Sequence, residues 1–473
     1  MQEYREIFVN GEWVASEGRE LIPVINPATE EVIAQVVDGT AADVDKAARA
    51  ARAAFEGWAH SRVEDRVEVF VRAREILSKQ VEQITDSIVR EVGHPRAWAE
   101  RAHAKGAMED LRVIIESLPR IEWERQITPE INLVREAAGV VAAITPWNGP
   151  LASICTKAGA AIAAGCTVVL KPSELAPLTS YLFVEAFRQA GLPDGVLNMV
   201  SGRGGSVGEP MVLHPDVEMI SLTGSLRAGR RIMELAAPSV KRLILELGGK
   251  SASIILSDAD LEAAVADSIA DGFRNSGQAC GCLTRMIVPA SRLAEVEQIA
   301  ARIAASYVPG DPFDPKTTIG PMANANQYAT VRRYITSGIE DGLKLLTGGL
   351  ERPEGVGDRG FYVRPTVFSG NNQSRIAREE IFGPVITIIP AEDDEAAIRI
   401  ANDSDLGLAG GVWAATPERA RSVARRLRSG RVRINGKPMS PWAPHGGFKL
   451  SGFGREWGQM GIEEFTASKS VIG

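Results

Sequence analysis

The sequence has few of the residues that cross-link small secreted proteins or build metal centres. Only 4 cysteines and 5 histidines occur among its 473 residues. The cysteines, Cys155, Cys166, Cys280 and Cys282, are too few for a chain of this length to depend on disulfides. No HExxH or CxxC pattern is present, so zinc has no obvious ligand set. We therefore predict no metal ion and a reducing, cytoplasmic compartment.

Long apolar runs and an excess of positive charge are also missing. The most apolar stretch, residues 158–170, is too short to span a bilayer. The first residues, MQEYRE, lack the basic start and apolar run of a signal peptide. The formal net charge of −7 provides no basic field for phosphate backbones. We therefore expect no membrane insertion, no export and no nucleic-acid partner.

What the sequence does have is the composition of a globular protein. Hydrophobic residues make up 45% and charged residues 24% of the chain, so disorder is not expected. A chain of 473 residues exceeds what one hydrophobic core normally spans. We therefore expect at least two domains.

The first half of the chain changes from a helical pattern to strands that alternate with helices. Residues 41–115 place apolar residues at three- and four-residue spacing, which predicts several amphipathic helices. Short apolar runs, each expected to form a strand, follow at 140–144, 167–170, 196–200, 219–222 and 243–247. Strands separated by helices predict a parallel, doubly wound α/β sheet, and ligands bind at the carboxyl ends of such strands.

Two further segments complete the outline. Residues 251–435 repeat the α/β pattern, with strands expected at 286–288 and 385–389. Residues 121–135 are mixed polar and β-branched around Pro129, which predicts an extended hairpin outside the core. We expect two α/β units and a small protruding element.

Three residues have the chemistry of a nucleophile and its helpers. Cys280 follows Gly277 and Gln278 among small residues, where a thiolate would meet a substrate closely. Glu246 ends an apolar strand, where a carboxylate would serve as a general base. Asn148 lies between two prolines, and its amide would donate to a developing oxyanion. Taken singly, each also has a structural reading: a packed cysteine, a surface glutamate and a turn asparagine.

The phosphate-binding signal is less direct. The segment GRGGSVG at 202–208 misses the GxGxxG spacing by one residue. The segment TGSLRAG at 223–229 follows a strand and opens a helix, where backbone N–H groups would meet a pyrophosphate. Residues 171–174, KPSE, follow another strand with side chains that bind hydroxyls. For either of the last two segments, a plain loop is the alternative.

Taken together, these motifs identify a resemblance to the aldehyde dehydrogenase superfamily over essentially the full chain. Six segments resemble family blocks in the family's order and approximate spacing: 138–174, 200–229, 245–250, 273–285, 379–385 and 446–456. The resemblance implies an α/β fold with a Rossmann-type cofactor domain, an α/β catalytic domain and a small β oligomerisation element. The implied boundaries are 1–118 with 138–247 for the cofactor domain, 248–441 for the catalytic domain, and 119–137 with 455–473 for the oligomerisation element.

The resemblance also implies roles in a reaction that oxidises an aldehyde to a carboxylic acid with NAD(P)+. Cys280 would be the nucleophile and Glu246 the base that hydrolyses the thioester. Asn148 and the Cys280 backbone N–H would hold the oxyanion, and Lys157 lies in the same region and would assist. Relatives that pass the acyl group to coenzyme A generally lack a base at the position of Glu246, so hydrolysis is favoured.

For the cofactor, the resemblance implies a site built from several loops. Glu174 would accept from a ribose 2′-hydroxyl and so favours NAD, whereas Lys171 and Ser173 would tolerate the 2′-phosphate of NADP. The implied cofactor-binding residues are Ile144, Trp147, Lys171, Ser173, Glu174, Gly204, Gly208, Gly224, Ser225, Gly229, Leu247, Glu380 and Phe382.

The chain departs from the family pattern at the substrate pocket. Gly149 stands where an aromatic residue is common, Thr156 replaces a frequent tryptophan and His445 replaces the usual phenylalanine. Loss of aromatic walls predicts a wide pocket for bulky, branched or aromatic aldehydes, which Trp442 would partly refill. Cys282 is expected to be structural, because a disulfide with Cys280 would close a strained ring.

Alternatives of function and assembly stay open at this point. The chain could be a semialdehyde-specific or acyl-transferring dehydrogenase, with Arg274 or Arg285 as the arginine for an anionic substrate. It could also be a catalytically silent NAD-binding homologue that kept the fold. The hairpin and a terminal strand near 464–472 pair across subunits in the family, which implies a homodimer or homotetramer.

Overall fold

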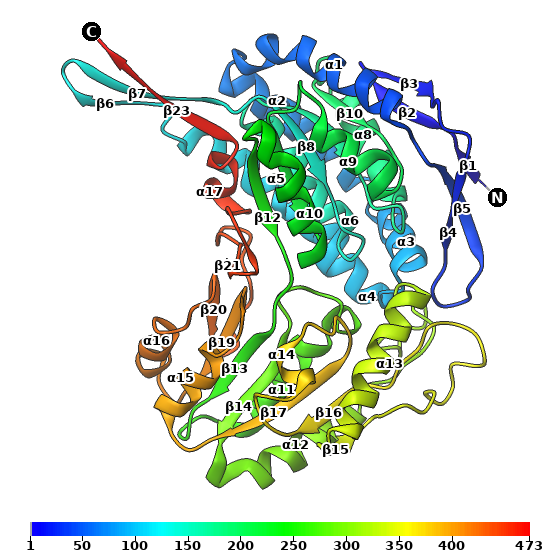
Figure 1. The fold of residues 1–473 in the computed structure, drawn as a ribbon, viewed down its shortest axis with the longest axis vertical. Helices are drawn as coiled ribbons and strands as arrows, with labels where there is room; N and C mark the ends of the chain where they lie inside the picture. Colours follow the sequence, from blue (N-terminus) through cyan, green and yellow to red (C-terminus); the bar gives the residue numbers. More distant parts are fainter. Residues whose placement is uncertain (1) are drawn as a thin grey trace.

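In the computed structural model, which describes residues 2–473, a large sheet fills the upper body of the molecule (Figure 1). Among these residues it has 8 strands in the order β22-β12-β11-β8-β9-β10-β2-β3. The five central strands pair in parallel, as predicted from their alternation with helices. Its strands are β2 Glu6–Val9, β3 Glu12–Ala15, β8 Val140–Ile144, β9 Thr167–Lys171, β10 Leu197–Met199, β11 Met219–Thr223, β12 Arg242–Glu246 and β22 Gly452–Phe453.

Helices cover both faces of this sheet. Capping residues explain where a helix begins, and small residues explain how closely it packs. Helix α1 (Ala41–Ala59) opens with a capping box in which Thr40 and Asp43 satisfy each other's backbone N–H groups. Its buried alanines Ala47, Ala48 and Ala51 allow close packing on the sheet. The other helices here are α2 Val63–Ser78, α3 Val81–Val92, α4 Arg96–Trp98, α5 Lys105–Ser117, α6 Pro150–Ile154, α7 Ala160–Ala163, α8 Leu178–Gln189, α9 Glu209–Leu213 and α10 Leu226–Ala236.

A second sheet forms the lower body, with 7 strands in the part of the chain that the structure describes. Its order is β15-β16-β17-β14-β13-β19-β20, and only β15 pairs antiparallel. Its strands are β13 Ser251–Ile255, β14 Leu283–Pro289, β15 Lys344–Thr347, β16 Thr366–Ser369, β17 Val385–Ala391, β19 Ala409–Trp413 and β20 Arg431–Ile434. Its helices are α11 Leu261–Phe273, α12 Leu293–Ala305, α13 Ala325–Glu340, α14 Arg375–Arg378, α15 Asp394–Asn402 and α16 Pro417–Ala424.

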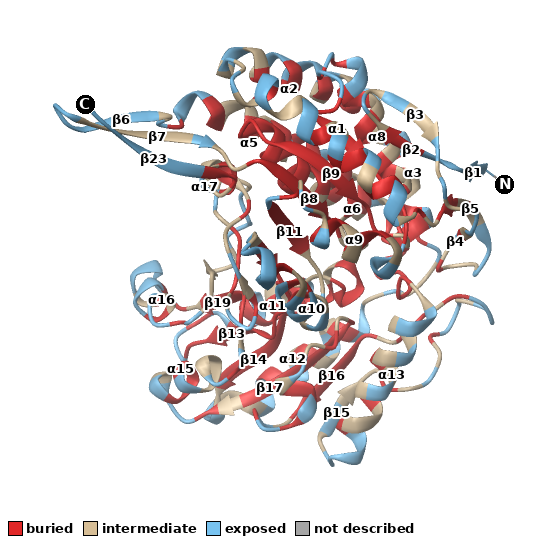
Figure 2. Ribbon diagram, turned by 45° about the horizontal axis from the view of Figure 1, so that its top comes forward, coloured by how far each residue is buried: buried red, intermediate tan, exposed pale blue. Residues whose placement is uncertain are grey.

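A thin three-stranded sheet projects from the body, as the sequence predicted for the hairpin (Figure 1). The hairpin β6 (Glu124–Thr128) and β7 (Ile131–Ala137) pairs with β23 (Thr466–Ile472), which follows α17 (Gly458–Glu463). Strand β23 pairs antiparallel with β7 along their whole length. Figure 2 shows that this sheet is largely exposed, whereas the core strands β8 and β9 are buried.

Some local structure was not predicted. Strands β1 (Gln2–Tyr4), β4 (Leu21–Ile25) and β5 (Val32–Val37) form a separate three-stranded sheet, and β18 (Leu406–Gly407) pairs with β21 (Phe448–Lys449). Wide π-helical turns interrupt the helices at Ala99–Ala104, Cys155–Gly159 and Gly204–Gly208. No helix within residues 2–473 has the length and apolar character needed to cross a membrane.

Candidate active site

Cys280 lies in the turn between α11 and β14, and a run of left-handed backbone shapes this turn. Asn275, Ser276 and Gly277 all have positive φ, at 51°, 57° and 73°. A Cβ on Gly277 would lie 2.1 Å from the carbonyl carbon of Gly383, so only glycine fits. Left-handed φ in the two other residues costs about 1 kcal/mol or more each and must be held by the surroundings.

Hydrogen bonds keep these two residues in the left-handed conformation. The Ser276 hydroxyl donates to the Gly320 carbonyl at 2.9 Å and accepts from the Gly320 N–H at 3.0 Å. The Asn275 side-chain oxygen accepts from the Trp98 indole N–H and contacts the His103 ring nitrogen at 3.1 Å. These bonds fix the turn that carries Cys280, so the nucleophile is placed by a rigid loop.

Asn148 and Glu246 reach the same place from the carboxyl ends of strands. Asn148 follows β8, and its Nδ2 donates to the Gln278 carbonyl at 2.9 Å, which leaves one N–H of the amide available. Glu246 is the last residue of β12 and is only 3% exposed. The structure therefore brings together the three residues that the sequence proposed as nucleophile, base and oxyanion donor.

His445 completes this cluster and contacts both reactive groups. Its Nε2 lies 3.0 Å from Glu246 Oε1 and 4.0 Å from Cys280 Sγ. The sulfur, a carboxylate oxygen and the ring nitrogen all lie within 4.8 Å of one another. Within residues 2–473 this is the one group of such side chains close enough to share a metal ion. We assign this cluster to the chemistry of the nucleophile. The absence of a metal ion from the site remains a prediction.

Burial and neighbouring charges set the state of the Cys280 thiol. Burial first, and the Glu246 charge second, raise the pKa of Cys280 well above its usual value. The guanidinium groups of Arg274 and Arg431 oppose this rise. The thiol thus needs a nearby proton acceptor or hydrogen-bond donor before it becomes a nucleophile near neutral pH.

A cavity of about 460 Å³ opens beside Cys280. Three of the four predicted pocket residues, Gly149, Thr156 and His445, line it. Trp442 does not belong to the lining, and the Arg120 guanidinium lies over its ring at 4.8 Å. The aromatic walls come instead from Trp98 and Trp457, whereas Ala102, Gly106, Ala152 and Ser153 contribute small side chains.

Lys157 lies near this cavity but does not line it. The side chain is fully buried, forms an ion pair with Glu456 and contacts the Ser221 hydroxyl at 3.3 Å. Glu456 itself is one of the lining residues. The structure therefore places Lys157 where it neutralises a carboxylate of the cavity wall.

A second cavity of about 260 Å³ meets the first at Cys280, and it fits the implied cofactor. A Cβ on Gly248 would lie 1.9 Å from a Glu380 carboxylate oxygen, so that position must stay small to admit this side chain. Burial raises the pKa of Glu380 to about 7. The lining contains Trp147, Gly224, Ser225, Leu247, Glu380 and Phe382 from the predicted cofactor set.

The remaining predicted cofactor residues lie outside this cavity, around the ends of β8 and β9. Lys171 Nζ forms a 3.3 Å ion pair with Glu174, and Ile144 is the registered partner of Lys171 in the sheet. The Lys171 side chain also passes 3.6 Å from the place of a Cβ on Gly208. Ser173 directly precedes Glu174, and Gly204 begins the π-helical turn that ends at Gly208, while Gly229 packs under Leu247.

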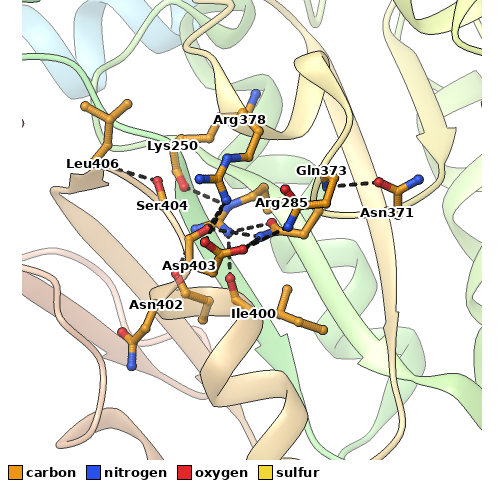
Figure 3. A network of polar contacts seen from close by, with 12 residues as sticks. Lys250, Arg285, Asn371, Gln373, Arg378, Ile400, Asn402, Asp403, Ser404 and Leu406 are labelled. Carbon is orange, nitrogen blue, oxygen red and sulfur yellow. Dashed lines mark hydrogen bonds and ion pairs between the residues drawn. The ribbon is translucent and has the colours of Figure 1, made fainter.

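Sequence reasoning missed several residues of the site. Arg431, Glu456 and Trp457 line the substrate cavity, yet they come 151 to 177 residues after Cys280; Arg431 and Trp457 lie outside the recognised segments, and Glu456 ends the segment 446–456 without having been assigned a role. Arg274 lines it as well, as considered from the sequence. Arg285 does not, because its guanidinium donates to the Lys250, Ile400 and Ala401 carbonyls in a buried network (Figure 3).

Comparison with known proteins agrees with this geometry. The model of the aldehyde dehydrogenase family matches residues 13–471. A 3-succinoylsemialdehyde-pyridine dehydrogenase of a Pseudomonas species is 45% identical over 475 residues, covering 100% of this chain and 99% of that protein.

Solved structures agree as well. A mutant of aldehyde dehydrogenase C from Pseudomonas syringae, in complex with NAD+ and octanal, has a TM-score of 0.97 and 46% identity, covering 99% of this chain and 96% of that one. Mycobacterium tuberculosis aldehyde dehydrogenase with NAD+ has a TM-score of 0.97 and 40% identity, covering 100% and 98%. The chain belongs to the aldehyde dehydrogenase family and is an enzyme that oxidises aldehydes with NAD+.

Proposed function

We propose that Cys280, Asn148 and Glu246 carry out the two halves of aldehyde oxidation. The observation that carries this proposal is that the sulfur and the carboxylate lie within 4.8 Å at the junction of two cavities. In the first half, Cys280 Sγ adds to the aldehyde carbon, and the free N–H of Asn148 with the Cys280 backbone N–H holds the oxyanion. NAD+ held by the residues of the second cavity would supply the hydride acceptor, and collapse of the oxyanion would leave a thioester on Cys280.

In the second half, Glu246 takes a proton from water, and the hydroxide attacks the thioester carbonyl. The C–S bond breaks, the carboxylic acid leaves and the thiolate of Cys280 is restored. The same two N–H groups hold the second oxyanion. Lys157 is too deep to touch the reacting atoms, and we assign it the role of holding Glu456.

The substitution E246Q tests this division of labour, because it removes the base but keeps the shape. The first turnover is expected to proceed as a burst of NADH, followed by a steady rate lower by about 10²–10⁴-fold. The control is N148D, which alters the oxyanion hole and should suppress the burst itself. A normal steady rate in E246Q would contradict the role of Glu246 as base.

For the cofactor, we propose that Glu380 accepts ribose hydroxyls beside the nicotinamide and that Ser225 presents its backbone N–H to the pyrophosphate. The Gly224 N–H donates to the Glu246 carbonyl at 3.0 Å, so we assign Gly224 to the wall of this site. Ser225 caps α10, so the positive end of an 11-residue helix faces that position. Glu174 would accept from the adenosine ribose, which favours NAD over NADP. The ratio of kcat/KM for the two cofactors measures this preference.

We further propose that the substrate is a bulky or long aldehyde. The 460 Å³ cavity and its small residues, Ala102, Gly106, Gly149 and Ala152, support this class. Octanal is bound in the similar Pseudomonas syringae structure. A panel of acetaldehyde, octanal and aromatic aldehydes should rank acetaldehyde last in kcat/KM. Acetaldehyde as the best substrate would contradict the proposal.

A second candidate is an aldehyde with a polar acceptor at a distance from the reacting carbon. Arg274 and Arg431 line the cavity, and each has a buried nitrogen without a hydrogen-bond partner among residues 2–473. A semialdehyde dehydrogenase is among the similar proteins. Tenfold or greater preference for a keto- or carboxy-substituted aldehyde over the matched alkyl aldehyde, lost in R431M, would favour this candidate. Coenzyme A dependence would instead favour acyl transfer, and NAD binding without any turnover a silent homologue.

We also propose a cytoplasmic homodimer or homotetramer that pairs through the projecting sheet. Strands β6 and β23 form the two edges of that sheet, and both carry mostly exposed residues. We also propose the domain boundaries at 118, 138, 247 and 441, which separate the projecting sheet, the cofactor domain and the catalytic domain from one another. Light scattering of the purified protein measures the number of subunits.

A further inference from the structure

His445 contacts both the proposed nucleophile and the proposed base. Its ring is only 5% exposed and stacks on Trp457, with ring centres 4.9 Å apart. Its backbone N–H donates to the Glu456 carbonyl at 2.7 Å and its carbonyl accepts from the Glu456 N–H at 2.7 Å. Backbone and ring are thus both held, and the position of Nε2 is fixed by the fold.

The contacts of the two ring nitrogens decide where the ring proton resides. Nε2 lies 3.0 Å from Glu246 Oε1, and a carboxylate oxygen can only accept. Nδ1 is buried without a hydrogen-bond partner among residues 2–473, and a second proton there would be unsatisfied. Neither Glu246 oxygen has a hydrogen-bond partner within this range, so the 3.0 Å approach of Nε2 is a contact outside hydrogen-bond geometry, whereas the contact of Nε2 with Cys280 Sγ meets that geometry. A ring proton on Nε2 is therefore directed at the Cys280 sulfur and not at the carboxylate.

The same nitrogen also faces the sulfur of Cys280 at 4.0 Å. We propose that His445 donates its Nε2–H to the Cys280 thiolate when the thiol loses its proton. This inference rests on the proposed role of Cys280 as nucleophile, and it adds a donor to the reacting sulfur that the family's usual phenylalanine cannot supply.

The step balances without any added reagent. The Cys280 S–H bond breaks and its proton passes to solvent water in the cavity, so Glu246 stays ionised as the base for the later hydrolysis. The Nε2–H stays on nitrogen throughout, and its hydrogen-bond acceptor changes only from a thiol to a thiolate. The ring thereby offsets part of the cost of placing a thiolate in a buried position.

Other charged groups face the same cluster from several elements and must be unchanged in any test. They are Arg274 beside the Cys280 turn, Arg431 on β20, Glu380 before β17, Glu456 before α17 and Asp110 on α5. The test therefore alters His445 alone and compares two side chains of similar reach. Phenylalanine keeps the ring over Trp457 but has no donor, whereas glutamine keeps an N–H near the position of Nε2.

The measurement is the rate at which iodoacetamide alkylates Cys280 as a function of pH, followed by mass spectrometry in wild type, H445F and H445Q. The C280A variant reports any background from the other cysteines. H445F should react about tenfold more slowly at neutral pH, with its reactivity profile displaced upward by about one pH unit. H445Q should stay within about threefold of wild type. Thermal unfolding of each variant verifies the fold, and H445L replaces H445F if phenylalanine does not fit.

Each outcome is decisive for the inference. A slow, displaced profile in H445F together with a near-normal one in H445Q supports the donor to the thiolate. Wild-type reactivity in H445F overturns it, and so does an equal loss in both variants, which would assign the ring a packing role only. Because alkylation needs no aldehyde, this result is separate from the E246Q burst experiment, which tests the proposed function itself.

Discussion

Two buried polar clusters in the molecule differ in whether their polar atoms form hydrogen bonds. Around Arg285, every guanidinium nitrogen donates: Nε to the Lys250 carbonyl at 3.0 Å, Nη1 to Asn372 and Ile400 at 2.9 Å, and Nη2 to Ala401 at 2.9 Å (Figure 3). Around Cys280, buried atoms without a hydrogen-bond partner gather within residues 2–473. They belong to Glu246, His445, Arg274 and Arg431.

The difference separates stability from chemistry. A fully paired buried cation stabilises one conformation of the loops that it bridges. Unpaired donors and acceptors around a cavity cost free energy in the empty site, and a substrate or a developing charge can recover that cost. The comparison predicts that changes in the Arg285 cluster lower stability, whereas changes in the Cys280 cluster lower activity.

The largest expected effect is on turnover. C280A removes the only side chain that can form the proposed thioester, so we expect kcat to fall by at least about 10³-fold. The free energy of unfolding should stay within about 1 kcal/mol of wild type, because the change is small in volume. NADH formation and denaturant unfolding measure the two quantities. Substantial turnover in C280A would place the nucleophile elsewhere.

The next effect is on stability and tests the other cluster. R285M leaves four carbonyl or amide oxygens without their donor, so we expect a loss of about 3–5 kcal/mol in the free energy of unfolding. Urea titration monitored by fluorescence measures it. The matched control is R62M on the surface, which should leave the midpoint unchanged. An unchanged midpoint in R285M would show that the paired cluster is not a source of stability.

A smaller effect is expected at the oxyanion position. N148A removes one donor to the oxyanion, and we expect kcat to fall by about 10²–10³-fold. Because Asn148 also donates to the Gln278 carbonyl at 2.9 Å, thermal unfolding of N148A must be compared with that of C280A. A fall in stability with unchanged kcat would move Asn148 from the chemical cluster to the structural one.

The smallest effect is a pH dependence of cofactor binding. Burial raises the pKa of Glu380 to about 7, so its carboxylate is ionised above that pH and protonated below it. Only the ionised form accepts from two ribose hydroxyls, so the Kd for NAD+ should rise about three- to tenfold as pH falls from about 8 to about 6. E380Q should remove this dependence. Fluorescence titration measures it, and equal slopes in both proteins would exclude Glu380 as the titrating group.

Much of the fold could be predicted because it follows from local pattern. The apolar runs at 140–144 and 167–170 became β8 and β9, which are fully buried as expected for parallel strands. The π-helical turn at Cys155–Gly159 was missed, because the helical pattern there looks continuous in sequence. The sheet of β1, β4 and β5 was missed because its short strands show no strong alternation.

The site was predictable where a motif carries it and not elsewhere. Cys280, Glu246 and Asn148 belong to segments that resemble the family, and the structure places them together. Arg431 and Trp457 line the cavity through tertiary packing alone, which spacing along the chain does not encode. Trp442 was expected in the pocket but does not line it, whereas His445, three residues further along the chain, does.

The distance along the chain between Cys280 and His445 has a consequence for synthesis. His445 follows Cys280 by 165 residues, and the partners Glu456 and Trp457 follow later still. A ribosome that has completed both the nucleophile and Glu246 has therefore not yet made this wall of the cavity. The nascent chain therefore carries the Cys280 thiol before the residues that enclose it have been made, so the closed form of the site can form only after residue 457 has been added.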